Sequence, residues 1–162
     1  MSQIDSGRPG GLSMGVSSFV HAGVIVDDLA VVVEFLTSLG LECGEPMIVE
    51  GEWLDRILGL PDARVEVVMA RTPDGAESLE LAKFHAPPAD ADSEPAPPNR
   101  PGIRHIAYAV DDLRAVVDRM RTAGWDTVGD VVDYEGKYLL CYLRGPEGLI
   151  VELAEPLRSE ST

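Results

Sequence analysis

The sequence is short of cysteine and of basic residues, and both shortages restrict what the protein can be. Cys43 and Cys141 are the two cysteines among 162 residues and form no C-x-x-C motif. A disulfide framework is therefore excluded, and free thiols in a reducing compartment are expected. Lysine and arginine number 13 against 28 aspartate and glutamate residues, which gives a net charge of −15. Such an acidic surface argues against nucleic acid or an anionic membrane as a partner.

Long apolar runs and a recognisable targeting segment are missing as well. No apolar run approaches the ~20 residues that cross a membrane. The first residues do not show the basic region followed by an apolar region that marks a signal peptide. We therefore expect a soluble, cytoplasmic protein. With 45% hydrophobic and 25% charged residues, the chain suits one globular domain, which two small halves can build.

What the sequence does contain is an internal repeat. The segment VHAGVIVDDL at residues 20–29 matches RHIAYAVDDL at residues 104–113, and the correspondence continues at the same offset through the segments that follow. A match of this length at a fixed offset indicates an internal duplication. The repeat gives His21 and His105, two of the three histidines, equivalent positions.

Each copy has the pattern of one strand, one helix and three further strands. Segments rich in apolar and β-branched residues predict the strands, and apolar residues at positions i, i+3, i+4 and i+7 predict the helices. Aspartate pairs stand where each helix would be capped, and a glycine ends each helix. The predicted strands are 19–26, 41–49, 63–70 and 78–84 in the first copy and 103–110, 125–132, 138–143 and 149–154 in the second; the helices are 29–39 and 111–123, with a helical turn at 53–58.

The predicted fold class is α+β, with two tandem βαβββ modules that form a curved mixed sheet around a central cavity. The modules are expected at residues 18–85 and 102–156, as one domain with flexible tails at 1–17 and 157–162. The linker at 86–101 is rich in proline, which excludes helix and sheet interiors. We expect this linker to be a passive connector.

Two glutamates stand inside apolar strands at equivalent points of the repeat. Glu80 and Glu152 each have leucine or valine on both sides. Neighbours in a strand point to opposite faces, so each carboxylate faces away from the apolar side chains. By the same argument His105 shares its face with two alanines, Ala107 and Ala109, whose small side chains leave room for a ligand.

Pseudo-twofold packing of the two halves would gather His21, Glu80, His105 and Glu152 around one cavity. Two imidazoles and two carboxylates fit a divalent metal ion such as Zn, Ni, Co, Mn or Fe(II). A metal ion also compensates carboxylates in a partly buried cavity, where unpaired charge is costly. The alternative from the residues alone is that all four are solvated side chains on an open sheet face.

At these residues the chain resembles the vicinal oxygen chelate superfamily, which includes glyoxalase I, methylmalonyl-CoA epimerase, extradiol dioxygenases and bleomycin-resistance proteins. The resemblance covers roughly residues 18–156. It rests on four segments: HAGVIVDDL at 21–29, PDG at 73–75 with LEL at 79–81, GIRHIAYAVDDL at 102–113, and GPEGLIVEL at 145–153. The resemblance implies paired βαβββ modules that cup a metal ion. It also implies a homodimer, in which modules of one chain or of two chains complete the cavity around a small-molecule substrate.

The ligand set narrows the activity that the resemblance implies. Glyoxalase-type members use His, Glu, His and Glu, which His21, Glu80, His105 and Glu152 supply, whereas epimerases commonly carry Gln at the second position. The resemblance therefore implies a lyase or isomerase of the glyoxalase or epimerase type. Its metal ion stabilises an enediolate or enolate, and Glu152 or Glu80 transfers a proton as general base. An Fe(II) extradiol-type dioxygenase and a non-catalytic small-molecule binding or antibiotic-resistance protein stay open as alternatives.

The substrate is not indicated, because no clear basic cluster marks a site for glutathione or coenzyme A. Arg104, Lys137 and Arg144 are candidates, and a surface position is the simpler expectation for each. His85 has no partner in the repeat and is expected at the surface. Cys141 lies in a predicted strand and is expected in the core.

Overall fold

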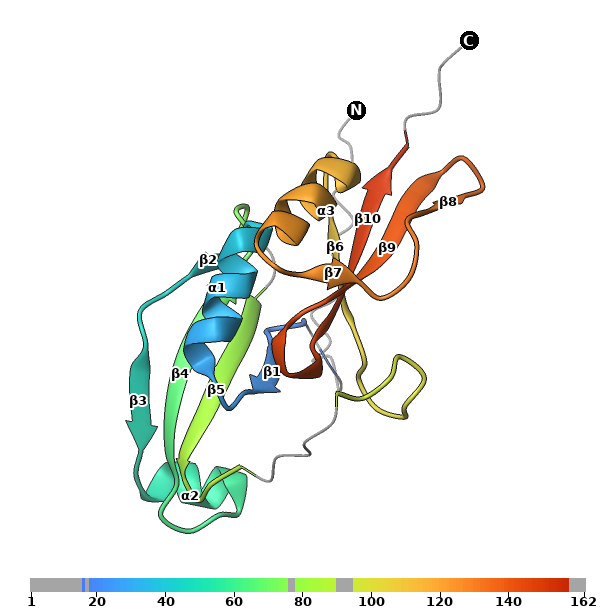
Figure 1. The fold of residues 1–162 in the computed structure, drawn as a ribbon. Helices are drawn as coiled ribbons and strands as arrows, with labels where there is room; N and C mark the ends of the chain where they lie inside the picture. Colours follow the sequence, from blue (N-terminus) through green and yellow to red (C-terminus); the bar gives the residue numbers. More distant parts are fainter. Residues whose placement is uncertain (1–15, 17, 76–77, 90–94, 158–162) are drawn as a thin grey trace, which may run out of the picture.

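The computed structural model describes residues 16, 18–75, 78–89 and 95–157, which form two modules side by side (Figure 1). The predicted tails, 1–17 and 157–162, lie almost entirely outside these residues. None of the helices in the described ranges is long and apolar enough to cross a membrane.

The first module is one mixed sheet with a long helix on one face. Its elements are β1 (Ala22–Ile25), α1 (Leu29–Leu39), β2 (Glu42–Cys43), β3 (Met47–Glu50), α2 (Glu52–Leu58), β4 (Arg64–Arg71) and β5 (Ser78–Ala86). The strands are ordered β1-β5-β4-β2, and β3 also pairs with β4. β1 is parallel to β5, while the other pairings are antiparallel.

The second module repeats this plan. Its elements are β6 (Ile106–Ala109), α3 (Leu113–Thr122), β7 (Asp126–Thr127), β8 (Val132–Tyr134), β9 (Tyr138–Arg144), the 3-10 turn η1 (Pro146–Gly148) and β10 (Ile150–Pro156). The order β6-β10-β9-β7, with β8 on β9, is equivalent to that of the first sheet. The prediction of an α+β fold built from two βαβββ modules is confirmed. Within the described part of the chain the strands form two five-stranded sheets, not one continuous sheet.

The predicted strands are too long in several places, for reasons of pairing. The segment 41–49 splits into β2 and β3 around Pro46, which cannot donate to a strand ladder. The segment 125–132 likewise contributes to two separate strands, β7 and β8. β6 begins at Ile106 and pairs from there with Val151, so residues 103–105 precede the ladder. His21 and His105 therefore lie one residue before β1 and β6 rather than inside them.

The helix ends follow the capping signals in the sequence. α1 spans the predicted residues 29–39, with the Asp28 carboxylate accepting the Val31 N–H at 3.2 Å and Gly40 in the left-handed conformation at φ 111°. α3 begins two residues later than predicted. The reason is that Asp112 is its N-cap and accepts the Ala115 N–H at 2.9 Å.

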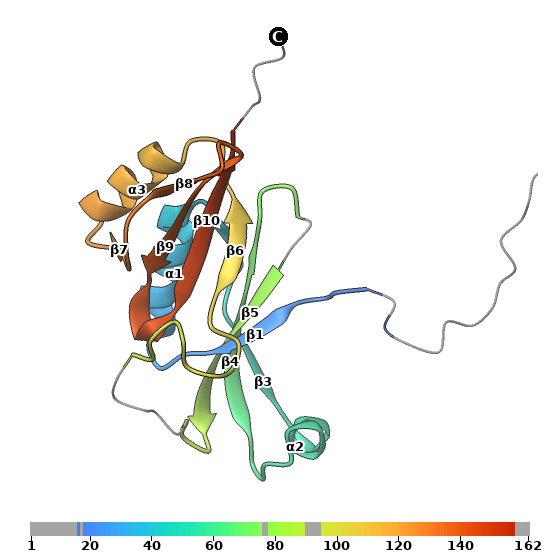
Figure 2. The ribbon, with the colours of Figure 1, turned by 90° about the vertical axis from the view of Figure 1, so that its right-hand side faces the viewer.

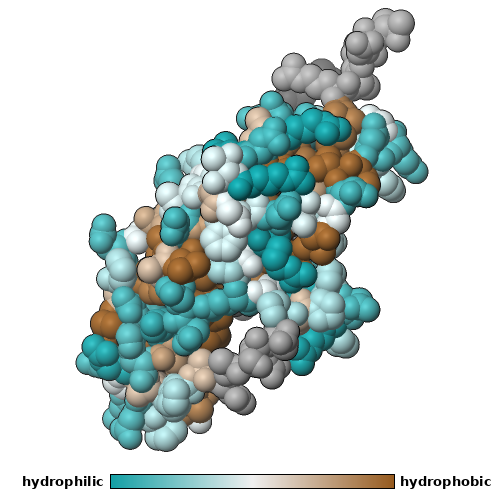
Figure 3. Space-filling model, in the orientation of Figure 1, coloured by the Kyte–Doolittle hydropathy of each residue, from teal (hydrophilic) through white to brown (hydrophobic). Residues whose placement is uncertain are grey.

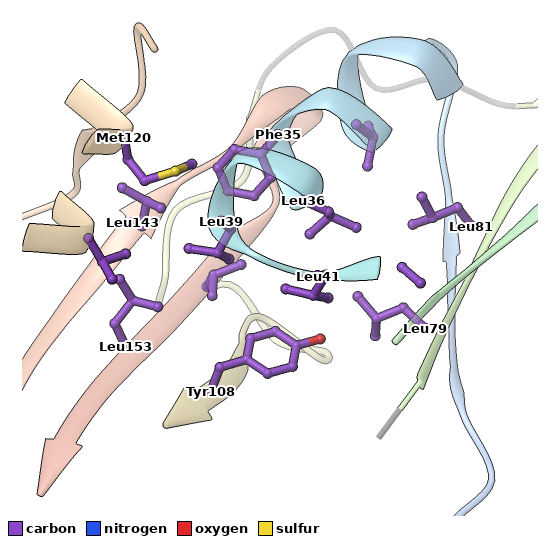
Figure 4. Packing of buried hydrophobic residues seen from close by; sticks show 14 of the residues in the cluster. Phe35, Leu36, Leu39, Leu41, Leu79, Leu81, Tyr108, Met120, Leu143 and Leu153 are labelled. Atoms are coloured by element: carbon purple, nitrogen blue, oxygen red, sulfur yellow. The ribbon is translucent and has the colours of Figure 1, made fainter. Parts of the chain in front are cut away.

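The main hydrophobic core joins the two modules through α1 (Figure 4). Phe35 and Leu36 of α1 are fully buried, and the Phe35 ring meets Trp125 of the second module edge-on at 5.2 Å. Strand residues of both sheets, among them Leu81 and Leu153, complete this core. Both sheets thus bury the face that carries the helices. The opposite faces carry the candidate site.

Candidate metal centre

The first predicted pair lies at the β1 edge of the first sheet. β1 runs beside β5 with Gly23 opposite Glu80. His21, two residues before Gly23, has its Nε2 atom 3.8 Å from Glu80 Oε2. Leu79 and Leu81 on either side of Glu80 are buried in the core. The Glu80 carboxylate therefore lies on the face away from α1, as strand alternation predicts.

The second pair has the same construction in the second sheet. β6 runs beside β10 with Ala107 opposite Glu152, and His105 again stands two residues before that point. The His105 Nε2 atom is 3.1 Å from Glu152 Oε2. Tyr142 lies opposite Glu152 on β9, and its ring is tilted by 33° against the His105 ring at a centroid distance of 5.0 Å. This aromatic contact helps to fix the orientation of the imidazole.

The donor atoms in each pair suit a divalent metal ion. Two ligand atoms about 2.1 Å from one ion lie roughly 3.0 to 3.4 Å apart at octahedral or tetrahedral angles. The His105–Glu152 distance of 3.1 Å matches this range, and the His21–Glu80 distance of 3.8 Å exceeds it slightly. Imidazole nitrogen with carboxylate oxygen is the mixed set that Zn, Ni, Co, Mn and Fe(II) accept. Each pair therefore fits as half of a metal site.

The structure brings the four residues together as two pairs. Among the residues it describes, no three His, Cys, Asp or Glu side chains lie close enough to hold one ion. His21 and His105 both line one cavity of about 900 Å³. Figure 2 shows β1 and the segment that leads into β6, which contribute residues to its wall. Glu80 and Glu152 do not line this cavity. The assignment of all four residues to one metal ion stays a prediction.

Other residues singled out in the sequence lie apart from these pairs. His85 forms a third histidine–glutamate contact, with its Nε2 atom 2.8 Å from Glu66 Oε2. This pair has no counterpart in the second module, in agreement with the absence of a repeat partner. Cys141 is buried as predicted, and burial raises the pKa of its thiol. Such a thiol is a poor nucleophile at neutral pH.

Sequence reasoning missed the contact between Tyr142 and His105. The signal was available, because the turn at 145–148 joins β9 to β10 and fixes their register. Counting back from the turn places Tyr142 opposite Glu152. The position of Arg104 was missed too. It was expected at the surface, and the structure places it half-buried in the cavity wall.

Comparison with known proteins identifies the family. A family model described as the Glyoxalase/Bleomycin resistance protein/Dioxygenase superfamily matches residues 20–142. A glyoxalase family protein from Bacillus cereus is 36% identical over 91% of this chain and 100% of its own, with a TM-score of 0.85. No curated protein matches the sequence.

More distant structures share the fold. A glyoxylase/bleomycin resistance protein/dioxygenase domain from Frankia sp. EAN1pec is 16% identical, with 88% of this chain and 99% of that chain covered and a TM-score of 0.61. The fosfomycin resistance protein FosX from Listeria monocytogenes, a mutant complexed with Mn(II) and 1S,2S-dihydroxypropylphosphonic acid, is 14% identical, with 86% and 90% covered and a TM-score of 0.58. The repeat, the two equivalent sheets and the family match over most of the chain agree, and the chain belongs to the glyoxalase/bleomycin resistance protein/dioxygenase superfamily.

Proposed function

We propose that the protein is a divalent-metal-dependent lyase or isomerase of the glyoxalase or epimerase type. His21, Glu80, His105 and Glu152 would hold the ion. One observation supports this proposal above the others: each module presents one histidine beside one glutamate at the same register position of equivalent strands. Duplication of one module would place the pair in both halves, and one metal site completed by both pairs would give each copy a role.

The complete site would form in a homodimer. In this arrangement the first module's pair of one chain meets the second module's pair of the other chain. Exposed apolar side chains on the same faces as the pairs support such a contact. Met47 of β3, opposite Val67, is 55% exposed, and Tyr134 and Tyr138, opposite each other on β8 and β9, are 53% and 41% exposed. A partner that covers these faces would bury the apolar groups and close the metal site together.

The chemistry follows from the donor set. The ion, when bound, supplies Lewis-acid polarisation of substrate oxygens. Glu152 or Glu80 takes the proton from the adjacent carbon as general base and returns it at the end of the reaction. The Tyr142 ring holds His105 in place beside Glu152.

Elemental analysis of the purified, untagged protein tests the metal site. We expect about one equivalent of Zn, Ni, Co or Mn per chain, and its loss in His105→Ala. His85→Ala is the matched control, because it breaks a histidine–glutamate pair that has no counterpart in the repeat. Failure to bind any ion after dialysis against a mixture of these four ions and Fe(II) would contradict both enzyme hypotheses and favour a binding protein. Iron together with oxygen uptake on catechols would favour the dioxygenase.

Proton transfer is tested separately on the loaded protein. Exchange of the substrate α-proton in D₂O is followed by NMR for the methylglyoxal–thiol hemithioacetal and for an acyl-CoA epimer pair. Glu80→Ala and Glu152→Ala are each expected to abolish the exchange. A rate retained in both variants would rule out the assignment of either glutamate as the base.

A further inference from the structure

We propose that the wall of the cavity beside the second histidine–glutamate pair binds a compact oxyanion between Arg104 and Arg144. The shared chemistry is a carboxylate, phosphate or phosphonate group. The substrate of this site would then be a small organic anion. The link to turnover rests on the proposed function, whereas the binding of the anion does not.

The two guanidinium groups converge on one atom. Arg104 Nη2 and Arg144 Nη1 each donate to the carbonyl oxygen of Ala96, both at 3.3 Å. The two cations therefore lie next to each other. Arg104 also donates from Nη1 to the carbonyl oxygen of Ile103, in a weak hydrogen bond of 3.4 Å. In the described part of the chain neither arginine has a carboxylate partner.

Some of the other basic residues are neutralised by a carboxylate, whereas Arg119 donates to the carbonyl oxygens of Ser38 and Leu39. Arg64 pairs with Glu50 at 3.1 Å and Arg121 with Asp126 at 2.8 Å. In a protein of net charge −15, two adjacent arginines that meet only carbonyl oxygens stand out. Like charges at this separation repel, and a neutral carbonyl does not cancel them. An oxyanion does, because its oxygens match the guanidinium fork.

Arg104 adds a second sign of an incomplete site. Its Nε atom is buried and has no hydrogen-bond acceptor among the described residues. Buried polar groups are normally satisfied, and the exceptions in a protein call for a ligand, an ion or a water. The residue also lines the cavity of about 900 Å³ together with His21 and His105.

Arg144 connects this position to the candidate metal centre. It lies on β9 two residues after Tyr142, so both side chains belong to the face that carries Glu152. Tyr142 in turn contacts His105. A ligand with oxygens at the histidine–glutamate pair can therefore place an anionic group against the arginines. The first module has no equivalent arginine pair, because Val20 stands at the position that corresponds to Arg104.

The linker takes part in this arrangement rather than serving as a passive connector. Pro95 packs over Gly148, where an added Cβ would lie 3.3 Å from Pro95 Cα. The next residue, Ala96, presents the carbonyl oxygen that both arginines share. Both linker residues line the cavity. The linker thus holds Arg104 at the cavity wall and Arg144 beside it, through the carbonyl oxygen that the two share.

The size and charge of the site restrict the ligand. A volume of about 900 Å³ accommodates a small organic molecule. One pair of arginines suits one compact anionic group. A coenzyme A thioester carries several phosphates and would need more positive charge than this pair provides. A small acid or phosphonate therefore fits better than a coenzyme A ester.

Calorimetric titration of the full chain tests the inference. EDTA-treated protein is titrated with acetate, malonate, inorganic phosphate and methylphosphonate at an ionic strength held constant with chloride. We expect saturable binding of at least one oxyanion, and the comparison of carboxylates with phosphorus oxyanions identifies the group. Arg104→Gln and Arg144→Gln should each weaken binding roughly tenfold or more, because a charge-assisted hydrogen bond is lost. Arg114→Gln removes the same charge from the exposed side of α3 and should leave binding unchanged.

Two outcomes would overturn the inference. One is the absence of saturable binding of all four probes to the unmodified protein, which needs no variant to interpret. The other is equal affinity in the variants at positions 104, 114 and 144. Arg144→Lys retains the charge without the fork and should bind with intermediate affinity. Anion binding without metal binding would refute only the proposed enzyme, and metal binding without anion binding would refute only this inference.

Discussion

Gly145 of the second module lies directly against Phe35 of the first module. A Cβ added there would lie 2.8 Å from Cε1 and 2.9 Å from Cζ of Phe35, whose side chain is fully buried. The backbone at φ −91° and ψ −176° is open to any residue. Glycine is therefore required at position 145 because the Phe35 ring leaves no space for a side chain, and not because of the backbone conformation.

Gly145→Ala should lower the free energy of unfolding by about 1–3 kcal/mol, because the methyl group overpacks the core between the modules. Urea denaturation followed by circular dichroism measures the change. Gly129→Ala is the control, since a Cβ at Gly129 meets nothing within 4 Å. Phe35→Leu in the Gly145→Ala background should cost less than the two single changes together. Equal stability of the alanine variants at 145 and 129 would contradict the clash.

The residues of the site differ in how far the sequence predicts them. The faces of Glu80 and Glu152 follow from alternation, which depends only on immediate neighbours, and both are confirmed. The meeting of Arg104 with Arg144 depends on the position of the Ala96 carbonyl oxygen, to which both donate. Contacts of such long range leave no local pattern. Sequence reasoning therefore finds the glutamates and misses the arginine pair.

At the scale of elements, the turn η1 caps a helix of the other module. The Glu147 carboxylate accepts the N–H groups of Asp27, at 2.8 Å, and of Asp28, where α1 begins. The first turn of α1 contains no acidic residue of its own. A carboxylate at a helix N-terminus satisfies unpaired donors and interacts favourably with the helix dipole. Glu147 thus ties the second module to the first.

Glu147→Ala should destabilise the protein by about 1–2 kcal/mol through loss of this cap. Glu135→Ala is a matched control, because Glu135 shares the left-handed backbone, at φ 55° against 54°, and contacts only an exposed lysine. The difference between the two variants in thermal or urea denaturation isolates the cap. Similar losses in both would mean that backbone conformation, and not the helix N-terminus, sets the effect.

Elements are predicted well where the signal is local. α1 has its predicted bounds because an aspartate and a glycine mark them, and both modules have the predicted order of strands. The segments 41–49 and 125–132 were predicted as single strands and are each divided between two. Their division depends on which residues of β4 and β9 remain available as partners. This pairing depends on the arrangement of strands in the folded sheet, and the local sequence does not indicate it.

At the scale of the whole molecule, the helix-bearing faces of the two modules pack into one shared core. α1 packs in the core between the sheets, and the histidine–glutamate pairs lie on the faces that remain (Figures 1 and 4). Apolar groups interrupt the hydrophilic surface in both modules (Figure 3). The repeat in the sequence predicts the two modules. The repeat cannot predict whether the two histidine–glutamate pairs meet within one chain or between two chains, because both arrangements would use the same four residues.

Mixing of two inactive chains tests whether the site forms between subunits. One chain carries His21→Ala and Glu80→Ala, and the other carries His105→Ala and Glu152→Ala. Each homodimer should lack metal, because every composite site contains one disabled pair. In a mixed dimer, one site joins the intact first module of one chain to the intact second module of the other. Random assembly should therefore restore metal to roughly one site in four.

Light scattering should first show a mass of twice 17.4 kDa, and different affinity tags on the two chains isolate the mixed dimers. Metal recovered in that fraction can come only from a site shared between chains, because neither chain alone retains more than one pair. A mixed dimer without metal, formed from chains whose unmodified parent binds it, would place the complete site within one chain. The two sheets would then have to close on each other when the ion binds, which would separate the Phe35 contact with Trp125 that now joins the modules. Fluorescence of Trp125 on addition of the ion, recorded in a Trp53→Phe background, distinguishes that closure from subunit assembly, since only closure moves this partly buried side chain away from the core.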